Sequence, residues 1–188
     1  LNNLGLLLKA QGEYARALPY LEEALAMLRR LYPQEKYPQG HPLLANLLDN
    51  LGGLLQERGS YAKALPYGEQ ALAMRRRLYP PAQYPAGHPD LATSLNNLGW
   101  LLCDAGSYEE ARPYLVQALT MFQQLYPPDE YPDGHPFVAD GLNNLGALLQ
   151  AAGASAAARP YYQQALAMRQ KLLDRHLTTA GEAEAMAL

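Results

Sequence analysis

The sequence predicts an all-α solenoid in which one helix-turn-helix unit is repeated about four times. Three series of residues recur at a constant step of 47 along the 188-residue chain. They are Gly5, Gly52, Gly99 and Gly146; Gly12, Gly59, Gly106 and Gly153; and Pro19, Pro66, Pro113 and Pro160. A fixed period of roughly 20 to 50 residues is typical of stacked repeat proteins, in which each unit contacts only its neighbours. Such a protein offers a long groove rather than a closed pocket.

The first helix of each unit is clearest in the third unit, where it follows His88-Pro89. Its apolar residues have the spacing of one helix face: Leu91, Leu95, Leu98, Leu101 and Leu102. Proline is compatible with the first turn because its missing N–H has no intrahelical partner there. We expect the helix to stop at Gly106, since glycine adopts the left-handed C-terminal conformation at little cost.

A second helix should begin directly after this turn, because Ser107 and Glu110 have the spacing of a capping box. Its apolar face comprises Ala111, Tyr114, Leu115, Ala118, Leu119 and Phe122. The helix should end near Tyr126, since Pro127-Pro128 cannot continue it. Pro113 falls inside this helix and removes a backbone hydrogen bond, so we expect a modest bend in each second helix.

The connectors between units are rich in proline and tyrosine. They run from Tyr32-Pro33 to His41-Pro42, from Tyr79-Pro80 to His88-Pro89 and from Tyr126-Pro127 to His135-Pro136. We expect them to be extended and ordered by their own tyrosine and proline contacts. The array should cover 1–173, with repeats at about 1–40, 41–87, 88–134 and 135–173. We expect an exit segment over 174–188, in which residues 179–182 are able to cap a short final helix over 183–188.

Composition excludes several classes of partner. The 15 basic and 18 acidic residues give a net charge of −3, whereas nucleic acids and anionic membranes need a basic surface. No apolar run of about 18 residues is present to span a membrane. A single cysteine excludes a disulfide framework and fits a reducing compartment, so we expect a cytoplasmic protein. The chain opens Leu1-Asn2-Asn3, which we interpret as the start of a fragment of a larger multidomain protein.

The motif residues resemble the tetratricopeptide repeat (TPR). In the second unit they are Leu51, Gly52, Leu55, Gly59, Tyr61, Ala64 and Ala71, and in the third Leu98, Gly99, Gly106, Tyr108, Ala111 and Ala118. The phrases at 94–99 and 87–90 are similar to repeats of the kinesin-light-chain type. The resemblance covers 1–173 and implies a right-handed TPR superhelix. The long connectors and the exit at 182–185 are similar to bacterial TPR arrays that precede a caspase-like CHAT peptidase domain.

One asparagine recurs in every unit and defines the main candidate site. The row is Asn3, Asn50, Asn97 and Asn144, with Asn2, Asn96 and Asn143 beside it and Asp49 in the second unit. The resemblance implies that the row lies on the concave side of the first helices, where related arrays hold a peptide backbone. Asparagine offers both a donor and an acceptor for that role. Alternatively, these side chains bond adjacent helices to each other and fix the stacking.

Trp100 is the second candidate for peptide binding. Its equivalents in the other units are Leu6, Gly53 and Ala147, so one large ring stands between two small residues. Tryptophan is enriched at interaction hot spots. Packing between neighbouring first helices is the equally weighted alternative.

Other reactive residue types favour structural roles. His41, His88 and His135 lie one per unit, about a helix-pair width apart, so they cannot share one metal ion and should pack at the connectors. Cys103 has no nucleophile motif around it and should be a small semi-buried apolar residue. The arginine run at 75–77 should be a solvated helix end.

We therefore expect a non-catalytic module that binds a protein or peptide in its concave groove. No acid-base, nucleophile, phosphate or metal constellation is present, so we expect neither an enzyme nor a cofactor. The alternative is a structural spacer or self-associating regulatory arm for a downstream effector domain, including a CHAT-type peptidase. A binding groove should show solvent-open polar and aromatic groups, whereas a spacer should show an exposed apolar patch.

Overall fold

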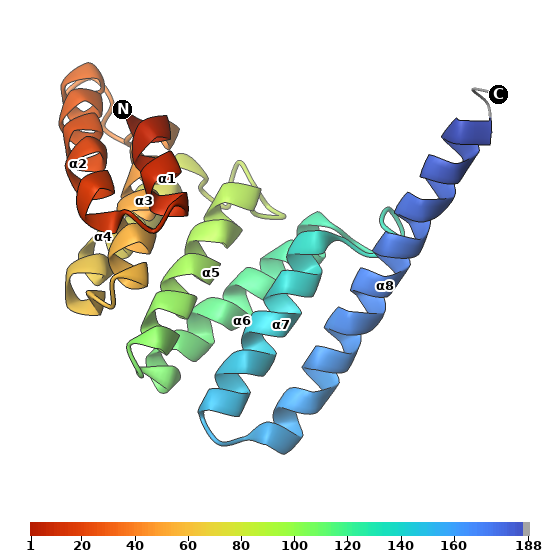
Figure 1. The fold of residues 1–188 in the computed structure, drawn as a ribbon. Helices are drawn as coiled ribbons and strands as arrows, with labels where there is room; N and C mark the ends of the chain where they lie inside the picture. The colour runs from red at the N-terminus through yellow and green to blue at the C-terminus, as the bar shows by residue number, and fades with distance from the viewer. Residues whose placement is uncertain (186–188) are drawn as a thin grey trace.

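The computed structural model describes the backbone of residues 1–185, and within them the chain forms four helix pairs and no strand. The helices are α1 (Asn2–Ala10), α2 (Tyr14–Leu31), α3 (Pro42–Glu57), α4 (Tyr61–Leu78), α5 (Pro89–Asp104), α6 (Tyr108–Leu125), α7 (Pro136–Ala151) and α8 (Ser155–Ala185). Each helix packs on the one before it, and the two ends of the chain lie at opposite ends of the array (Figure 1). The predicted all-α solenoid is confirmed.

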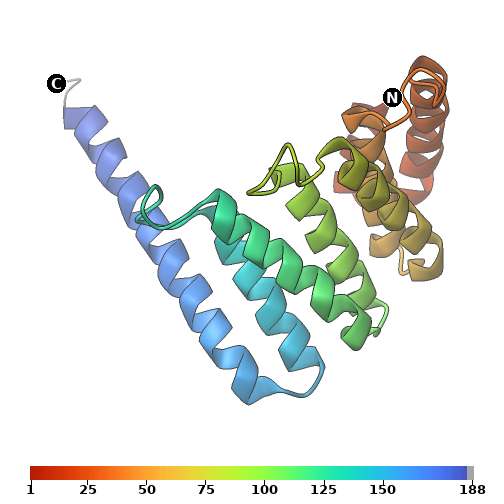
Figure 2. The same ribbon diagram turned by 180° about the vertical axis from the view of Figure 1, so that it is seen from behind.

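The pairs form two layers. In Figure 1 α5 and α7 lie in front of α6, and Figure 2, seen from behind, shows α6 in front of α7. The first helices α1, α3, α5 and α7 also contact one another directly along the array. They therefore form a continuous inner surface that runs through all four units.

Small residues allow the two helices of a pair to approach closely. Ala17, Ala64 and Ala111 have no exposed surface. A Cβ atom added to Gly99 on α5 would lie 2.7 Å from Cγ of Leu115 on α6. Larger side chains at these positions would push the helices apart, which explains why glycine and alanine recur with the repeat.

The turn between the helices differs in one detail from the prediction. Gly106 has a φ of 81°, as expected for the residue after the helix. Its N–H bonds to Cys103 O, and the N–H of Ser107 bonds to Leu102 O at 2.9 Å, which is the Schellman pattern. The predicted capping box is wrong: Ser107 makes no side-chain capping bond. Because the Ser107 N–H already has a carbonyl partner, Glu110 has no donor to reach back to.

The connectors are turns rather than extended segments, which corrects the prediction. In the first, Tyr37 N–H bonds to Pro33 O and Gly40 N–H bonds to Tyr37 O. The expected tyrosine contacts are present: the His41 ring stacks on Tyr32 at 3.6 Å between centroids, with Tyr37 edge-on at 5.9 Å. The same arrangement recurs around His88 and His135.

Each connector is also fixed to the unit that follows it. Gly87 has a φ of 87°, and a Cβ atom there would lie 2.5 Å from Cγ of Met121 on α6. Gly40 and Gly134 stand in the same relation to Met74 and Met168. The methionine packs on the glycine backbone, so the connector holds both neighbouring units in one register.

The second helices run as single helices through their internal prolines, and the bend at Pro113 and its equivalents stays a prediction. The exit segment does not form a separate capping helix, because α8 continues without interruption to Ala185. Leu173-Asp174 stands where the other units have Tyr-Pro, so no proline stops the helix there. The part of the predicted capping helix at 186–188 lies outside the described residues.

Candidate functional site: the inner groove of the first helices

A groove of about 520 Å³ lies on the inner surface over α1, α3, α5 and α7. The polar residues that line it are Lys9, Asp49, Asn50, Gln56, Glu57, Asn96, Asn97, Asp104 and Asn144, together with the ring of Trp100. Five of the seven predicted peptide-binding residues therefore line one surface. Asn3 and Asn143 do not line it.

Hydrogen bonds between first helices cross this groove with a constant offset. Asn50 Nδ2 donates to Asn2 Oδ1 at 3.2 Å, and Asn144 Nδ2 donates to Asn96 Oδ1 at 2.9 Å. Each bond joins a residue to one 48 positions further along. Two members of the row thus bond adjacent helices, as the stacking alternative predicted. Each bond uses one N–H and leaves the donor amide a second N–H and its oxygen.

The equivalent bond is missing in the middle of the groove. There the partners would be Asp49 on α3 and Asn97 on α5, but the Asp49 carboxylate is held by Arg75 at 2.7 Å and accepts from Ser94 Oγ at 3.1 Å. Among the described residues, the Asn97 side chain has no hydrogen-bond partner, and it is exposed. We call this position the open rung: of the row residues that line the groove, Asn97 is the one whose amide keeps all its donors and acceptors.

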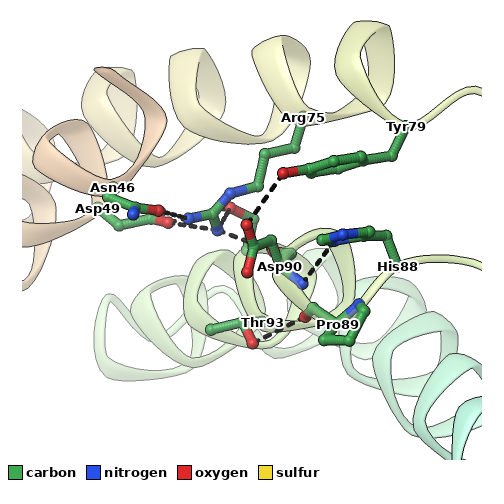
Figure 3. A network of polar contacts seen from close by, with 9 residues as sticks. Asn46, Asp49, Arg75, Tyr79, His88, Pro89, Asp90 and Thr93 are labelled. Atoms are coloured by element: carbon green, nitrogen blue, oxygen red, sulfur yellow. Dashed lines mark hydrogen bonds and ion pairs between the residues drawn. The ribbon is translucent and has the colours of Figure 1, made fainter. Parts of the chain in front are cut away.

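The Arg75 side chain holds Asp49 in the position that leaves Asn97 without a partner (Figure 3). It is 4% exposed and extends from α4 to the first helices. Besides Asp49, its Nη1 donates to Ser94 Oγ and to the Asp90 backbone oxygen at 2.8 Å, and its Nη2 donates to Asn46 Oδ1. The prediction of a solvated helix end is therefore wrong for Arg75. Its equivalents Leu28 and Phe122, 47 residues before and after it, are apolar. This indicates that the position faces the interior.

Burial governs the protonation of this network. Desolvation raises the pKa of Asp49, and this effect outweighs the attraction of Arg75 and the hydrogen bonds that favour the carboxylate. Tyr79 donates its hydroxyl to Asp90 Oδ2 at 3.0 Å, and desolvation together with that carboxylate raises the pKa of Tyr79 to about 12. The network is a structural junction in which Asp49 pairs with Arg75 and Tyr79 donates to Asp90.

Next to the open rung lies an aromatic and acidic corner. Trp100 and Asp104 are four residues apart on α5, which places them on one face. Gly53 stands opposite on α3 and leaves space there. Lys9 lies over Gly53 but pairs with Glu57 at 3.0 Å, whereas Asp104 receives a 2.7 Å hydrogen bond from the neutral Gln56 amide. Asp104 is therefore the groove carboxylate whose charge no cation balances.

The remaining candidates have structural positions. The histidines serve as N-caps: His88 Nδ1 accepts the Asp90 N–H at 3.2 Å, and His41 and His135 accept in the same way. Cys103 is 7% exposed and belongs to the core, and desolvation raises the pKa of its thiol. Lys9 and Gln56, which have the same place in the first two units, make cross-helix contacts instead.

The described side chains include no group of three or more histidine, cysteine or acidic residues able to hold a metal ion. Over the same part of the chain, none of the helices combines the length and hydropathy that a membrane span requires.

Comparisons with solved structures give the same fold. The chain is similar to BtubC (BKLC) from P. vanneervenii, with a TM-score of 0.72, 23% identity, and coverage of 91% of this chain and 62% of that one. It is also similar to a Rap protein complexed with Competence and Sporulation Factor, with a TM-score of 0.66, 16% identity, and coverage of 90% and 42%. The chain thus spans under two thirds of the length of both. A putative kinesin light chain from Podosopora anserina matches with a TM-score of 0.44 and 17% identity, covering 91% and 94%.

No curated protein matches the chain. Profiles described as tetratricopeptide repeat match residues 1–77, 91–136 and 138–177. They cover most of the sequence and agree with the helix pairs and with the small residues that let them pack. The chain belongs to the tetratricopeptide repeat family.

Proposed function

We propose that the inner groove binds an extended segment of a partner protein or peptide, and that Asn97 holds its backbone. The observation that carries this proposal is the open rung. An exposed amide with unused donors and acceptors, set in a groove between ordered neighbours, can pair with both the N–H and the C=O of an extended chain. Tetratricopeptide repeats generally mediate protein–protein interaction, and the Rap neighbour is complexed with a factor.

The seven candidate residues have different parts in this proposal. Asn97 is the primary anchor and Trp100 supplies apolar contact. Asn50 and Asn144 shape the groove through their bonds to the preceding helix and retain one N–H each for a ligand. Asn96 is mainly an acceptor for Asn144. Asn3 and Asn143 lie outside the groove and contribute little.

Peptides selected from a random phage-displayed library on the immobilised protein provide the test. Their affinities for the wild type and for Asn97→Ala are compared by fluorescence anisotropy, with Asn3→Ala as the matched control because it is also exposed but outside the groove. Losing one backbone hydrogen bond should weaken binding about two- to tenfold. Equal affinities for wild type and Asn97→Ala, or an equal loss in Asn3→Ala, would contradict the proposal.

A structural arm that self-associates is the second candidate. Apolar side chains on α1 are exposed, with Leu4 at 42% and Leu7 at 55%, whereas their equivalents Leu51 and Leu54 are fully buried. Sedimentation velocity over a range of concentrations tests this candidate. If the wild type associates and Leu7→Glu makes it monomeric, the self-associating arm is supported. If wild type and Leu7→Glu are both monomeric, the arm, with or without a downstream CHAT domain, has no support and the groove is the functional surface.

A further inference from the structure

We propose that the groove selects a peptide with one cationic side chain and, about four to five residues away, one bulky apolar side chain. The cation would lie between Trp100 and Asp104, and the apolar side chain would enter a second hollow beside Leu28 and Leu43. This inference rests on the proposed function, because it names the class of peptide that the same groove accepts.

The charges at the first subsite favour a cation. Lys9 neutralises Glu57 and Arg75 neutralises Asp49, which leaves the Asp104 carboxylate with only an amide donor. Asp104 is exposed, so a ligand can reach it. The side chain of a ligand lysine or arginine would complete the pairing, whereas an acidic side chain would meet an unbalanced negative charge.

Trp100 adds a second feature that recognises a cation. Its ring is partly buried against the core and partly open to the groove, one helical turn before Asp104. An ammonium or guanidinium group over an indole face is attracted by the ring quadrupole, and a nearby carboxylate acts in the same direction. Gly53 on the facing helix contributes no side chain, and the Lys9 Nζ that lies over it is held by Glu57 at 3.0 Å.

The second hollow is apolar and has a volume of about 610 Å³. It is lined on one side by Met27, Leu28, Leu43 and Leu47. Met27 and Leu43 are 51% and 47% exposed, so apolar surface is available to a ligand. Arg75 lies at its wall, but Asp49 neutralises that charge, and the hollow therefore favours an apolar group.

The two subsites share a boundary, which sets the spacing of the ligand groups. Asp49, Asn50 and Asn97 line both hollows, so the open rung lies between them. Leu43 and Gly53 mark the two sites on α3 and are separated by ten residues of helix, which corresponds to about 15 Å at 1.5 Å per residue. An extended peptide rises about 3.3 Å per residue, so about four to five residues span that distance.

Synthetic twelve-residue peptides test the proposal. The probe carries one arginine and one leucine four positions apart in a Gly/Ser background. Its variants replace arginine by glutamine or glutamate, replace leucine by serine, or place the two groups adjacent. We expect the probe to bind most tightly, each single replacement to lose about two- to fivefold, and the glutamate peptide to lose the most.

Protein variants assign the effect to the groove. Asp104→Asn should reduce binding of the arginine peptide by about two- to fivefold but leave the glutamine peptide unchanged, and Glu109→Gln, an exposed acid on α6, should change neither. Trp100→Phe keeps an aromatic ring in contact with the core. It should reduce binding of the arginine peptide by less than Asp104→Asn does. Circular dichroism confirms that each variant is folded.

The outcomes separate the two levels of the proposal. If library-selected peptides depend on Asn97 but carry no cation, or bind Asp104→Asn as well as wild type, the cation subsite is wrong and the binding groove stands. If no peptide depends on Asn97, the proposed function fails, and the selectivity proposal fails with it.

Discussion

Two junctions of the array solve the same packing problem with opposite chemistry. Between α4 and α5, the buried group is Arg75, bonded to Asp49, Ser94, Asn46 and the Asp90 carbonyl. Between α6 and α7, the equivalent residue is Phe122, whose ring packs on Phe137 at 5.3 Å between centroids. The Arg75 and Phe122 side chains are both nearly inaccessible to solvent, at 4% and 3% exposure.

The difference between the two junctions changes the hydrogen bonds between first helices in the groove. At the aromatic junction no buried charge competes for the polar row, and Asn144 bonds to Asn96. At the charged junction Asp49 contacts Arg75 and Ser94 through Oδ2 and makes no bond to Asn97. A buried ion pair contributes little net stability, because desolvation offsets the attraction. Its consequence here is to leave one amide open at the centre of the inner surface.

The largest effect should come from breaking the charged junction on one side only. Asp49→Ala leaves the Arg75 guanidinium buried and unpaired, and should lower the free energy of unfolding by about 3–5 kcal/mol. Urea denaturation measures it. The double variant Asp49→Asn with Arg75→Leu takes the residues of equivalent units and should unfold within about 1 kcal/mol of wild type, because no charge is left unpaired. A double variant as unstable as Asp49→Ala would contradict this account.

The aromatic junction should respond in proportion to the apolar area removed. Phe137 is 41% exposed, so Phe137→Ala should lower the free energy of unfolding by about 1–2 kcal/mol. No buried charge remains to add a penalty. A loss as large as that of Asp49→Ala would show that the two junctions do not differ in the way proposed, and the same urea titration measures both variants.

Acid should act on both junctions through their histidine caps. Burial lowers the pKa of His88 and of His135 below 6.5, and each neutral Nδ1 accepts a backbone N–H. A depressed folded-state pKa gives stability that is present above the unfolded value and is lost as pH falls through the folded value. We expect stability to fall below about pH 6.5. His88→Asn, which caps without titrating, should flatten the part of this slope due to His88, and an unchanged slope would contradict its assignment.

The smallest effect should come from the exposed counterpart of the charged junction. Arg169 is the equivalent of Arg75, and it pairs with Asp140 at 2.7 Å with both side chains more than half exposed. Surface pairs contribute about 0–1 kcal/mol, so Asp140→Ala should barely move the urea midpoint. A loss near that of Asp49→Ala would mean that burial is not what separates the two pairs.

The fold could be predicted because its causes are local. Leucine spacing, glycine after each first helix and proline after each histidine act within a few residues, and all three recur with the repeat. Arg75 also carried a readable signal, since its register is apolar in two other units and Asp49 departs from asparagine in the same unit. The unpaired state of Asn97 could not be predicted, because it depends on which of several partners Asp49 contacts in three dimensions. The capping box failed for a similar reason, since Ser107 N–H had a competing carbonyl.

The constant offset of the cross-helix bonds has a consequence for how such a chain can change in length. Duplication or loss of one whole 47-residue unit leaves every residue facing an equivalent partner and every connector glycine beneath its methionine. Deletion of a single codon within a first helix instead rotates the rest of that helix by about 100° and turns its leucines away from the core. The gene can therefore grow or shrink in units of one repeat far more readily than by single residues.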